Sequence, residues 1–308
     1  MSAAAHLAFV TTWLSASVRL SGPLLLAALG EIYAERSGVV NVGVEGTILL
    51  GALASYLVAV MTGSPLLGIL AAVLAASLFL AFFYVAVQAS QVVIGIVFNL
   101  LALGLASVIY RAAMGDVPRL VSAPMIDSAS IPGLADLPVV GPVLFQQSPM
   151  LYATMALAIV AGVILYRTRF GLNLRAVGEN PRAAAAAGLR VARTRLIGVL
   201  ISGLGAGLAG AYLIVCQIGL FRDTISAGRG FIALAIVILG RWNPFAAIGA
   251  AFAFGAADAL GLSMQLLSLP IPPQLFIALP YLMTVVAISG LFGRARGPAA
   301  LMQPYHEE

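Results

Sequence analysis

The chain has 308 residues, of which 62% are hydrophobic and only 9% are charged, and its mean hydropathy is +1.07. Soluble domains carry about 25% charged residues, so a water-soluble fold could not bury this much apolar surface. The net charge of +5 rests on arginine alone, because the chain has no lysine. Much of it gathers in one loop between apolar segments, which indicates membrane topology and argues against nucleic acid as a partner.

Long apolar segments predict an all-α bundle of membrane-spanning helices, because about 20 helical residues cross a hydrocarbon core about 30 Å thick. Barrel strands would be far shorter. In chain order, the expected spans are 16–33, 46–61, 65–87, 92–112, 149–166, 196–217, 231–240, 245–264 and 274–292. Arg19 leaves the start of the first span open. The 231–240 segment is too short to cross upright, so it is a half-helix or extends through its flanks, which gives eight to nine crossings. No segment forms a second domain, so 1–308 is one transmembrane domain.

The arginines predict the orientation of these spans. Seven of the sixteen lie in the loop 167–195, which is therefore expected in the cytoplasm, together with Arg241, Arg294 and Arg296. The loop 113–148 then lies outside, as does the N-terminus. That outer loop carries three acidic residues, Asp116, Asp127 and Asp136, against only Arg119.

An unusual polar stretch, residues 37–46, interrupts an apolar run where the second span begins. It holds three glycines, Asn41 and Glu45. Irregular backbone at membrane depth survives only where it is buried or lines a cavity. Asn41 and Glu45 are four residues apart, so on a helix they would share a face. We expect a cavity-facing or gating role; the alternative is a polar turn at the inner surface.

Three other polar residues fall inside predicted spans: Glu31, Asn99 and Asp258. A carboxylate at mid-bilayer costs at least about 2.5 kcal/mol, so such groups face an interior or a water path. Asn99 and Asp258 either line the substrate pathway or make an interhelical hydrogen bond, whereas the hydrogen bond is favoured for Glu31.

The loop 167–195 contains a short helix with clear boundaries. Asn180 is a good N-cap, Pro181 fits the first helical position, five alanines follow, and Gly188 permits a left-handed exit. A well-formed basic helix on the inner face of a membrane protein is expected to contact a partner.

The glycine-rich run 202–210 contains a GxGxxG-like pattern. A dinucleotide site needs that pattern between a strand and a helix, whereas here it lies inside an apolar span. Small residues at this spacing let membrane helices approach closely. We therefore expect helix packing at Gly203, Gly205, Gly207 and Gly210.

Catalytic residues and metal ligands are not expected in this chain. A P-loop would need a lysine, and the two histidines, His6 and His306, lie near the termini. Cys216 is the only cysteine, so no internal disulfide can form.

Three stretches, 34–46, 174–188 and 230–244, resemble the permease subunits of ATP-binding cassette (ABC) importers of the branched-chain amino acid, ribose and simple-sugar group. The resemblance covers roughly residues 20–292. It is strongest to the branch that imports nucleosides with a lipoprotein receptor of the basic membrane protein type.

This resemblance implies a protein of the bacterial cytoplasmic (inner) membrane that imports nucleosides, with purine nucleosides favoured. Two permeases pair, usually as two different homologues; a cytoplasmic ATPase binds ATP and Mg²⁺, and an extracytoplasmic lipoprotein delivers substrate. This chain would hold no cofactor and catalyse no reaction. The alternatives are simple sugars such as ribose, branched-chain amino acids, or an ATP-independent secondary transporter.

The resemblance also implies roles for named residues. The coupling to the ATPase would use Arg175, Gly178, Glu179, Asn180, Pro181, Arg182, Ala183, Ala187 and Gly188. A nucleoside needs partners for its ribose hydroxyls and an aromatic or apolar face for its base. Residues that suit this pathway are Asn41, Glu45, Phe98, Asn99, Phe254 and Asp258.

Overall fold

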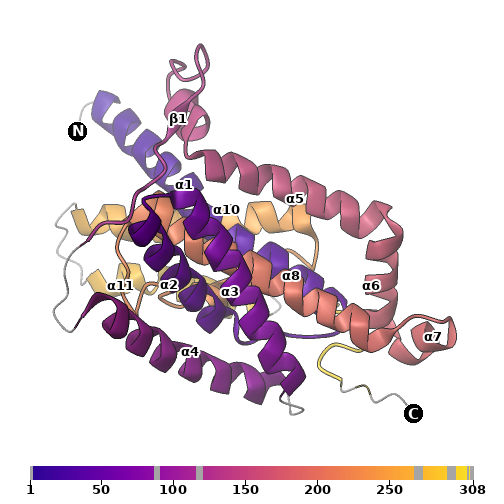
Figure 1. Ribbon diagram of the computed structural model, residues 1–308. Helices are drawn as coiled ribbons and strands as arrows, with labels where there is room; N and C mark the ends of the chain where they lie inside the picture. Colours follow the sequence, from indigo (N-terminus) through magenta and orange to yellow (C-terminus); the bar gives the residue numbers. More distant parts are fainter. Residues whose placement is uncertain are drawn as a thin grey trace.

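Helices make up nearly all of the regular structure in the computed structural model, which describes residues 3–86, 91–115, 121–266, 273–289, 296–303 and 305 (Figure 1). The long helices are α1 (Ala3–Arg36), α2 (Val44–Thr62), α3 (Pro65–Ala86), α4 (Gln91–Met114), α5 (Pro149–Arg167), α8 (Val191–Tyr212) and α10 (Pro244–Leu266). The shorter helices are α6 (Arg169–Glu179), α7 (Pro181–Ala186), α9 (Arg229–Leu239), α11 (Pro273–Ile277) and α12 (Leu279–Ile288). The remaining described elements are the π-helical η1 (Gly141–Phe145) and η2 (Leu213–Ile218), and the antiparallel strands β1 (Ala129–Ser130) and β2 (Gln146–Gln147).

Seven helices among the described residues are long and apolar enough to cross a membrane. Two shorter apolar helices, Arg229–Leu239 and Gln274–Val286, accompany them. The predicted fold class, an all-α membrane bundle with one half-helix, is therefore confirmed, and the chain is a multi-pass membrane protein.

The first helix starts well before the expected position 16, at Ala3. Its early part contains Thr and Ser residues, which weaken the apolar signal. In the structure, Thr11 and Ser17 donate their hydroxyls to carbonyls four residues earlier, at 2.9 and 2.7 Å. These bonds satisfy the hydroxyls inside the helix, so polar residues do not end it. Arg19 lies on its exposed side.

The last predicted span, 274–292, is broken rather than continuous. Helix α11 ends at Ile277, Ala278 is in a turn, and α12 begins at Leu279. Pro280 explains the break, because proline lacks an N–H and its ring clashes with the carbonyl four residues earlier. Residues 290–292 lie outside the described residues.

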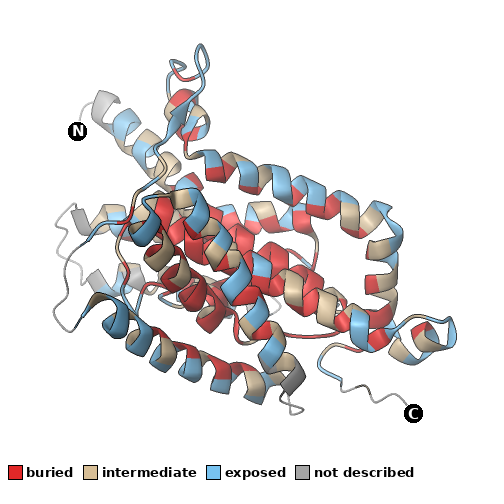
Figure 2. Ribbon diagram, in the orientation of Figure 1, coloured by how far each residue is buried: buried red, intermediate tan, exposed pale blue. Residues whose placement is uncertain are grey.

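Helix α8 lies at the centre of the bundle and is the most deeply buried of the seven long helices (Figure 2). Its glycines face three neighbours: Gly203 and Gly207 face α3, Gly205 faces α1 and Gly210 faces α2. A Cβ atom at Gly205 would lie 2.6 Å from a carbonyl oxygen of α1, and one at Gly207 would lie 2.7 Å from a carbonyl oxygen of α3. The backbones thus approach as closely as glycine permits.

The two ends of the bundle are formed by different segments of the chain. Helices α6 and α7 project at one end, beside the C-terminal tail, while the N-terminus and β1 lie at the opposite end (Figure 1). Around residues 121–126, the long loop hydrogen-bonds to the end of η2: the N–H of Ala123 donates to Gly219 at 2.7 Å and that of Ile126 to Val215 at 2.7 Å. Asp127 and Asp136 are exposed on this loop, whereas Asp116, Arg119, Arg294 and His306 lie outside the described residues.

Candidate functional site

The chain between α1 and α2 is non-helical and runs along α8 inside the bundle. Ser37 packs against Gly198 of α8, whereas Asn41 reaches Ser202, one helical turn further along α8. Glu31 of α1, which is fully buried, holds this segment: its carboxylate accepts the N–H of Asn41 at 2.8 Å and the hydroxyl of Ser202 at 2.7 Å. The structural hydrogen bond predicted for Glu31 is therefore present.

Two asparagines satisfy the first amides of α2. Asn41 Oδ1 accepts the N–H of Gly43 at 2.9 Å, and its Nδ2 donates to Ser202 at 3.0 Å. Asn99 of α4 accepts the N–H of Gly46 at 2.8 Å and donates to the carbonyl of Val42 at 3.1 Å. Asn99 thus holds this irregular backbone with both its oxygen and its nitrogen, whereas Asn41 holds it with its oxygen and ties it to α8 through its nitrogen.

The expectation that Asn41 and Glu45 share a helical face is wrong. Helix α2 begins only at Val44, so Asn41 belongs to the preceding turn. Gly38, at φ +91°, and Asn41 redirect the chain, so that the Asn41 side chain turns toward α8 and that of Glu45 toward α9.

Glu45 caps the start of the half-helix α9. Its Oε1 accepts the N–H of Gly228 at 2.8 Å and its Oε2 accepts the N–H of Gly230 at 2.7 Å. The first amides of a helix have no partner within it, and its N-terminus carries a partial positive charge, so a carboxylate there is stabilising. With 11 residues, α9 is only about 16 Å long, which is half a membrane.

Asp258 of α10 faces the same helix end. Its Oδ2 lies 3.9 Å from Nη2 of Arg229, the first residue of α9. The predicted alternatives for Asp258 did not include this ion pair. The sequence could have indicated that Arg229 needs a polar partner. An arginine directly before an apolar segment has a desolvation cost like that of Asp258. Phe254 lies elsewhere, fully buried in the hydrophobic core.

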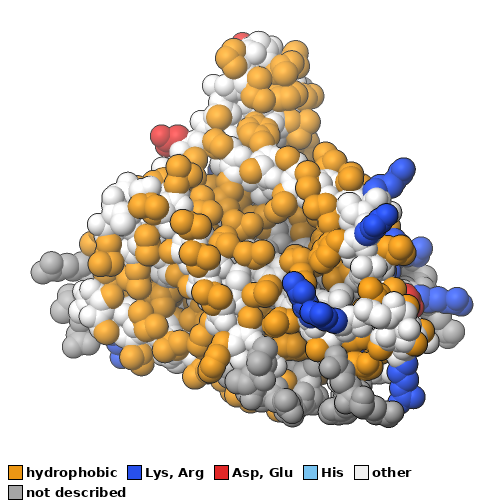
Figure 3. Space-filling model, turned by 45° about the vertical axis from the view of Figure 1, so that its right-hand side comes forward, with side chains coloured by type: hydrophobic (Ala, Val, Ile, Leu, Met, Phe, Trp, Pro, Cys, Tyr) orange, Lys and Arg blue, Asp and Glu red, His pale blue; other side chains and the backbone are white. Residues whose placement is uncertain are grey.

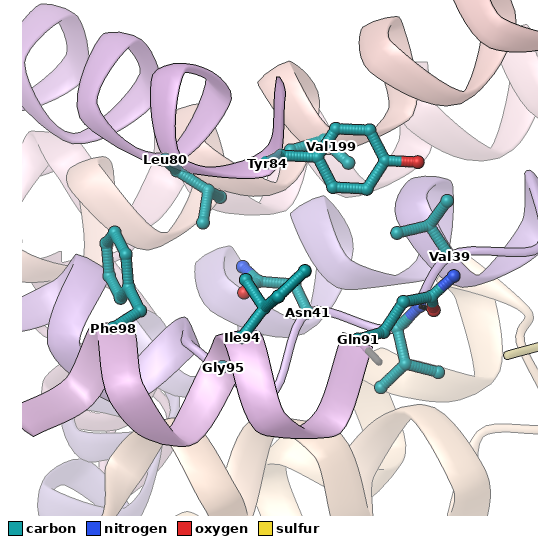
Figure 4. Close-up of a pocket in the computed structure, with 10 residues that line it drawn as sticks. Val39, Asn41, Leu80, Tyr84, Gln91, Ile94, Gly95, Phe98 and Val199 are labelled. Carbon is teal, nitrogen blue, oxygen red and sulfur yellow. Dashed lines mark hydrogen bonds between the residues drawn. The ribbon is translucent and has the colours of Figure 1, made fainter. Parts of the chain in front are cut away.

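A small cavity adjoins the irregular segment before α2 (Figure 4). Its volume of about 20 Å³ admits one water molecule and nothing larger. Phe98 and Gln91 of α4 line it, opposite Leu80 and Tyr84 of α3, and Asn41 lies between the two helices. A solute could pass here only if α3 and α4 separated.

The basic end is built from α6 and α7. Asn180 accepts the N–H of Ala183 at 3.0 Å and caps α7, and Gly188 follows with φ +85°, so the short helix predicted from the sequence is confirmed. Among the predicted coupling residues, those exposed are Glu179, Asn180, Arg182, Ala183, Ala187 and Gly188. Pro181 and Arg175 are half-buried, and the Arg175 guanidinium lies 5.2 Å from the centre of the Tyr166 ring.

Arginines form an exposed basic surface at this end (Figure 3). The members of the loop 167–195 that are exposed are Arg167, Arg169, Arg182, Arg190 and Arg193. Arg195 is different: only 4% of it is exposed, and it donates to the carbonyl of Gln303 at 3.0 Å.

A tight turn between α9 and α10 packs against the end of α1. Arg241 and Trp242 both adopt left-handed conformations, at φ 53° and 55°. The indole N–H of Trp242 donates to the buried carboxylate of Glu35, and Arg36 Nε donates to the Trp242 carbonyl at 3.1 Å. Strained backbone of this kind persists only where the surroundings fix it.

The C-terminal tail joins these parts. The N–H of Ala300 donates to the carbonyl of Gly178 at 2.9 Å, and that of Met302 donates to the carbonyl of Gly38 at 3.3 Å. Gly178 also packs directly on the backbone of Arg36. The three stretches 34–46, 174–188 and 230–244 thus meet at one end of the bundle, which sequence reasoning alone did not reveal.

Comparison with known proteins gives a consistent family. Residues 13–288 match the family described as branched-chain amino acid transport system / permease component. A guanosine ABC transporter permease of Bacillus subtilis is 40% identical, covering 94% of this chain and 95% of the relative. A nucleoside ABC transporter permease of Lactococcus lactis is 36% identical over 91% and 92%. A putative glucose ABC transporter permease of Haloferax volcanii is 33% identical over 98% and 99%.

A solved structure shares the fold. It is an inward-facing conformation of a putative metal-chelate type ABC transporter, with a TM-score of 0.52 over 91% of this chain and 85% of that one. The identity of 15% supports a common architecture only.

Proposed function

The chain belongs to the family of permease components of branched-chain amino acid transport systems, and from this membership we propose that it is the transmembrane permease subunit of an ABC importer for nucleosides. The observation that carries the proposal is the 40% identity, over nearly the full length of both chains, to a permease named for guanosine transport. Substrate crosses the cytoplasmic membrane by alternating access.

Energy comes from a partner ATPase, which holds ATP and Mg²⁺. The exposed α7, with its basic surroundings, supports docking on the ATPase. Movement of α7 would reach the bundle through Gly178, which contacts both Arg36 and the tail. ATP binding to the partner then shifts the population between outward-open and inward-open states.

The substrate pathway lies beside the starts of α2 and α9. Glu45 and Asp258 face the start of α9, while Asn41, Asn99 and Phe98 surround the start of α2. Asn41 and Asn99 hold the backbone, Phe98 faces the small cavity, and Phe254 supports the core from α10.

Two further partners complete the importer. A second, homologous permease would cover an apolar face; α4 is the least buried of the seven long helices and exposes Leu100, Leu103 and Val108. An extracytoplasmic receptor would dock on the opposite end from α7 and deliver substrate.

Simple sugars are the second candidate substrate class. The 33% identity to a putative glucose permease, over almost the whole of both chains, favours this alternative over branched-chain amino acids. The machinery would be the same, and only the solute would differ.

Uptake by cells that express the complete importer tests the proposal. We expect ATP-dependent uptake of radiolabelled guanosine or adenosine, which Ala183→Trp with Ala187→Trp abolishes by blocking α7. Both alanines are exposed, so the chain itself should still fold. Leu134→Trp, an exposed position on the outer loop, is the matched control and should transport normally.

The outcomes separate the substrate from the coupling. Uptake of glucose or ribose but of no nucleoside would contradict the nucleoside assignment. Uptake that persists after loss of the ATPase would contradict an ABC mechanism.

A further inference from the structure

On the orientation predicted from the arginines, the segment between η2 and α9, residues 219–228, runs from the outer end of the bundle to the start of α9. Its beginning contacts the outer loop, where Gly219 accepts the N–H of Ala123 at 2.7 Å. Its end contacts the first turn of α2, where the N–H of Gly228 donates to Glu45 at 2.8 Å. On that orientation the segment lies in the outer half of the membrane, and it forms no helix.

Irregular backbone at this depth must be buried in protein or line a water-filled cavity. Arg222, Thr224 and Ala227 are exposed, so this segment is not enclosed by the described part of the chain. A hollow of about 370 Å³ lies along it, lined by Ile218, Leu220, Arg222, Thr224, Ile225, Ala227 and Arg229. Small-molecule sites occupy about 300–1,000 Å³, so the hollow is large enough for one solute.

Arg229 lines the hollow, and Asp258 lies beside Arg229 with hydrogen-bonding capacity to spare. Arg229 Nη1 donates to the carbonyl of Ile225 at 3.1 Å, which fixes the guanidinium, and Nη2 faces Asp258 at 3.9 Å. That distance is too long for a hydrogen bond. Within the part of the chain that the structure describes, Asp258 accepts no hydrogen bond, and its side chain is 37% exposed.

The capping of α9 does not require this pair, because Glu45 already satisfies its first amides. An arginine at a helix N-terminus is electrostatically unfavourable. A carboxylate at mid-membrane is unfavourable as well. The ion pair offsets part of both costs, yet it leaves the Asp258 carboxylate without a hydrogen-bond donor among the described residues, and a polar ligand could supply one.

An aromatic ring contacts Ala227, one of the residues that line the hollow. Tyr281 of α12 donates its hydroxyl to the carbonyl of Ala227 at 3.3 Å and packs against Gly228, yet half of the residue remains exposed. A hydroxyl-binding ion pair beside an exposed aromatic ring suits a molecule with a polyhydroxy part and a planar part.

We propose that Arg229, Asp258 and Tyr281 form a nucleoside-binding site in the outer half of the membrane, reached through the hollow along residues 218–229. Asp258 accepts hydrogen bonds from the ribose hydroxyls, Arg229 donates to a ribose or base oxygen, and the base stacks on Tyr281. This site rests on the proposed function and assigns substrate recognition to residues other than the asparagines at the start of α2.

Transport kinetics of the complete importer test the site. The substrates are guanosine and its 2′,3′-dideoxy analogue, and the variants are Asp258→Asn, Tyr281→Ala and Tyr281→Phe. We expect Asp258→Asn to raise the KM for guanosine about tenfold and to change that for the dideoxy analogue less, because the hydroxyls that it recognises are missing there. Tyr281→Ala should raise both KM values about tenfold, and Tyr281→Phe should restore them.

Matched controls are Asp127→Asn on the exposed outer loop and Arg111→Gln at the exposed end of α4, which should behave as the wild type. Basal ATP hydrolysis should stay constant in these two controls. Guanosine kinetics unchanged by Asp258→Asn and Tyr281→Ala would overturn the site while leaving the proposed function intact, as would an equal loss for both substrates in Asp258→Asn. A wild-type importer that takes up sugars but no nucleoside would overturn the proposed function and the stacking role of Tyr281 together.

Discussion

At the scale of single residues, the polar side chains inside the bundle mainly complete backbone hydrogen bonding. Glu31, Asn41 and Asn99 each accept or donate at the interruption between α1 and α2, and Glu45 does the same for α9. In a membrane, an unpaired N–H has no water to bond. The hydrogen bonds from these side chains therefore lower the free-energy cost of interrupting the helices.

Glu45→Ala is therefore expected to destabilise the protein. It leaves the amides of Gly228 and Gly230 without acceptors, and an unsatisfied buried donor costs about 1–3 kcal/mol. The thermal midpoint of the purified chain in detergent should fall by several degrees, and uptake should be lost. Asp136→Ala, on the exposed loop, should leave both unchanged. An unaltered midpoint in Glu45→Ala would refute the capping role.

At the scale of elements, glycine determines how closely α8 approaches its neighbours. Gly205→Ala would place a Cβ atom 2.6 Å from a backbone oxygen of α1, so the helices must move apart. We expect a loss of about 1–3 kcal/mol in unfolding free energy. Gly104→Ala on α4 is the matched control, since nothing lies within 4 Å of its added methyl group. It should be neutral or stabilising by up to about 1 kcal/mol, measured by thermal unfolding of both variants side by side.

Sequence patterns predicted most elements but not the contacts between them. Apolar length placed the spans, and the Asn180, Pro181 and Gly188 signals placed α7. Three features were not predicted from the sequence. Helix α1 starts early, because its hydroxyls bond inside the helix, and Pro280 interrupts the last span. The turn before α2 separates Asn41 from Glu45. The pairing of Arg229 with Asp258 depends on tertiary packing and has no local signature.

At the scale of the whole molecule, the end of the bundle that carries α7 is held together by parts distant in sequence. Arg195 is buried and bonds to Gln303, and its guanidinium lies 6.0 Å from the centre of the Tyr305 ring. The tail in turn bonds to Gly178 and Gly38. Hydrogen bonds thus join the end that carries α7 and the start of the irregular segment before α2 into one unit.

Arg195→Gln should loosen this unit. We expect guanosine uptake to fall at least about fivefold, because removing a buried charged donor costs about 1.5–3 kcal/mol. Arg193→Gln, an exposed neighbour on the same helix, should retain uptake within about twofold. Limited proteolysis of the tail, followed by mass spectrometry, would show whether it is released. A tail equally protected in both variants would contradict the anchoring role of Arg195.

The tail also imposes an order on biosynthesis. Residues 296–303 follow every described helix in the chain, so the ribosome makes them after those helices. Until the tail is made, the carbonyls of Gly178, in α6, and of Gly38 lack the N–H donors that Ala300 and Met302 supply. A chain that ends before residue 296 would lack these two hydrogen bonds, so the end of the bundle that carries α7 would be held by fewer contacts.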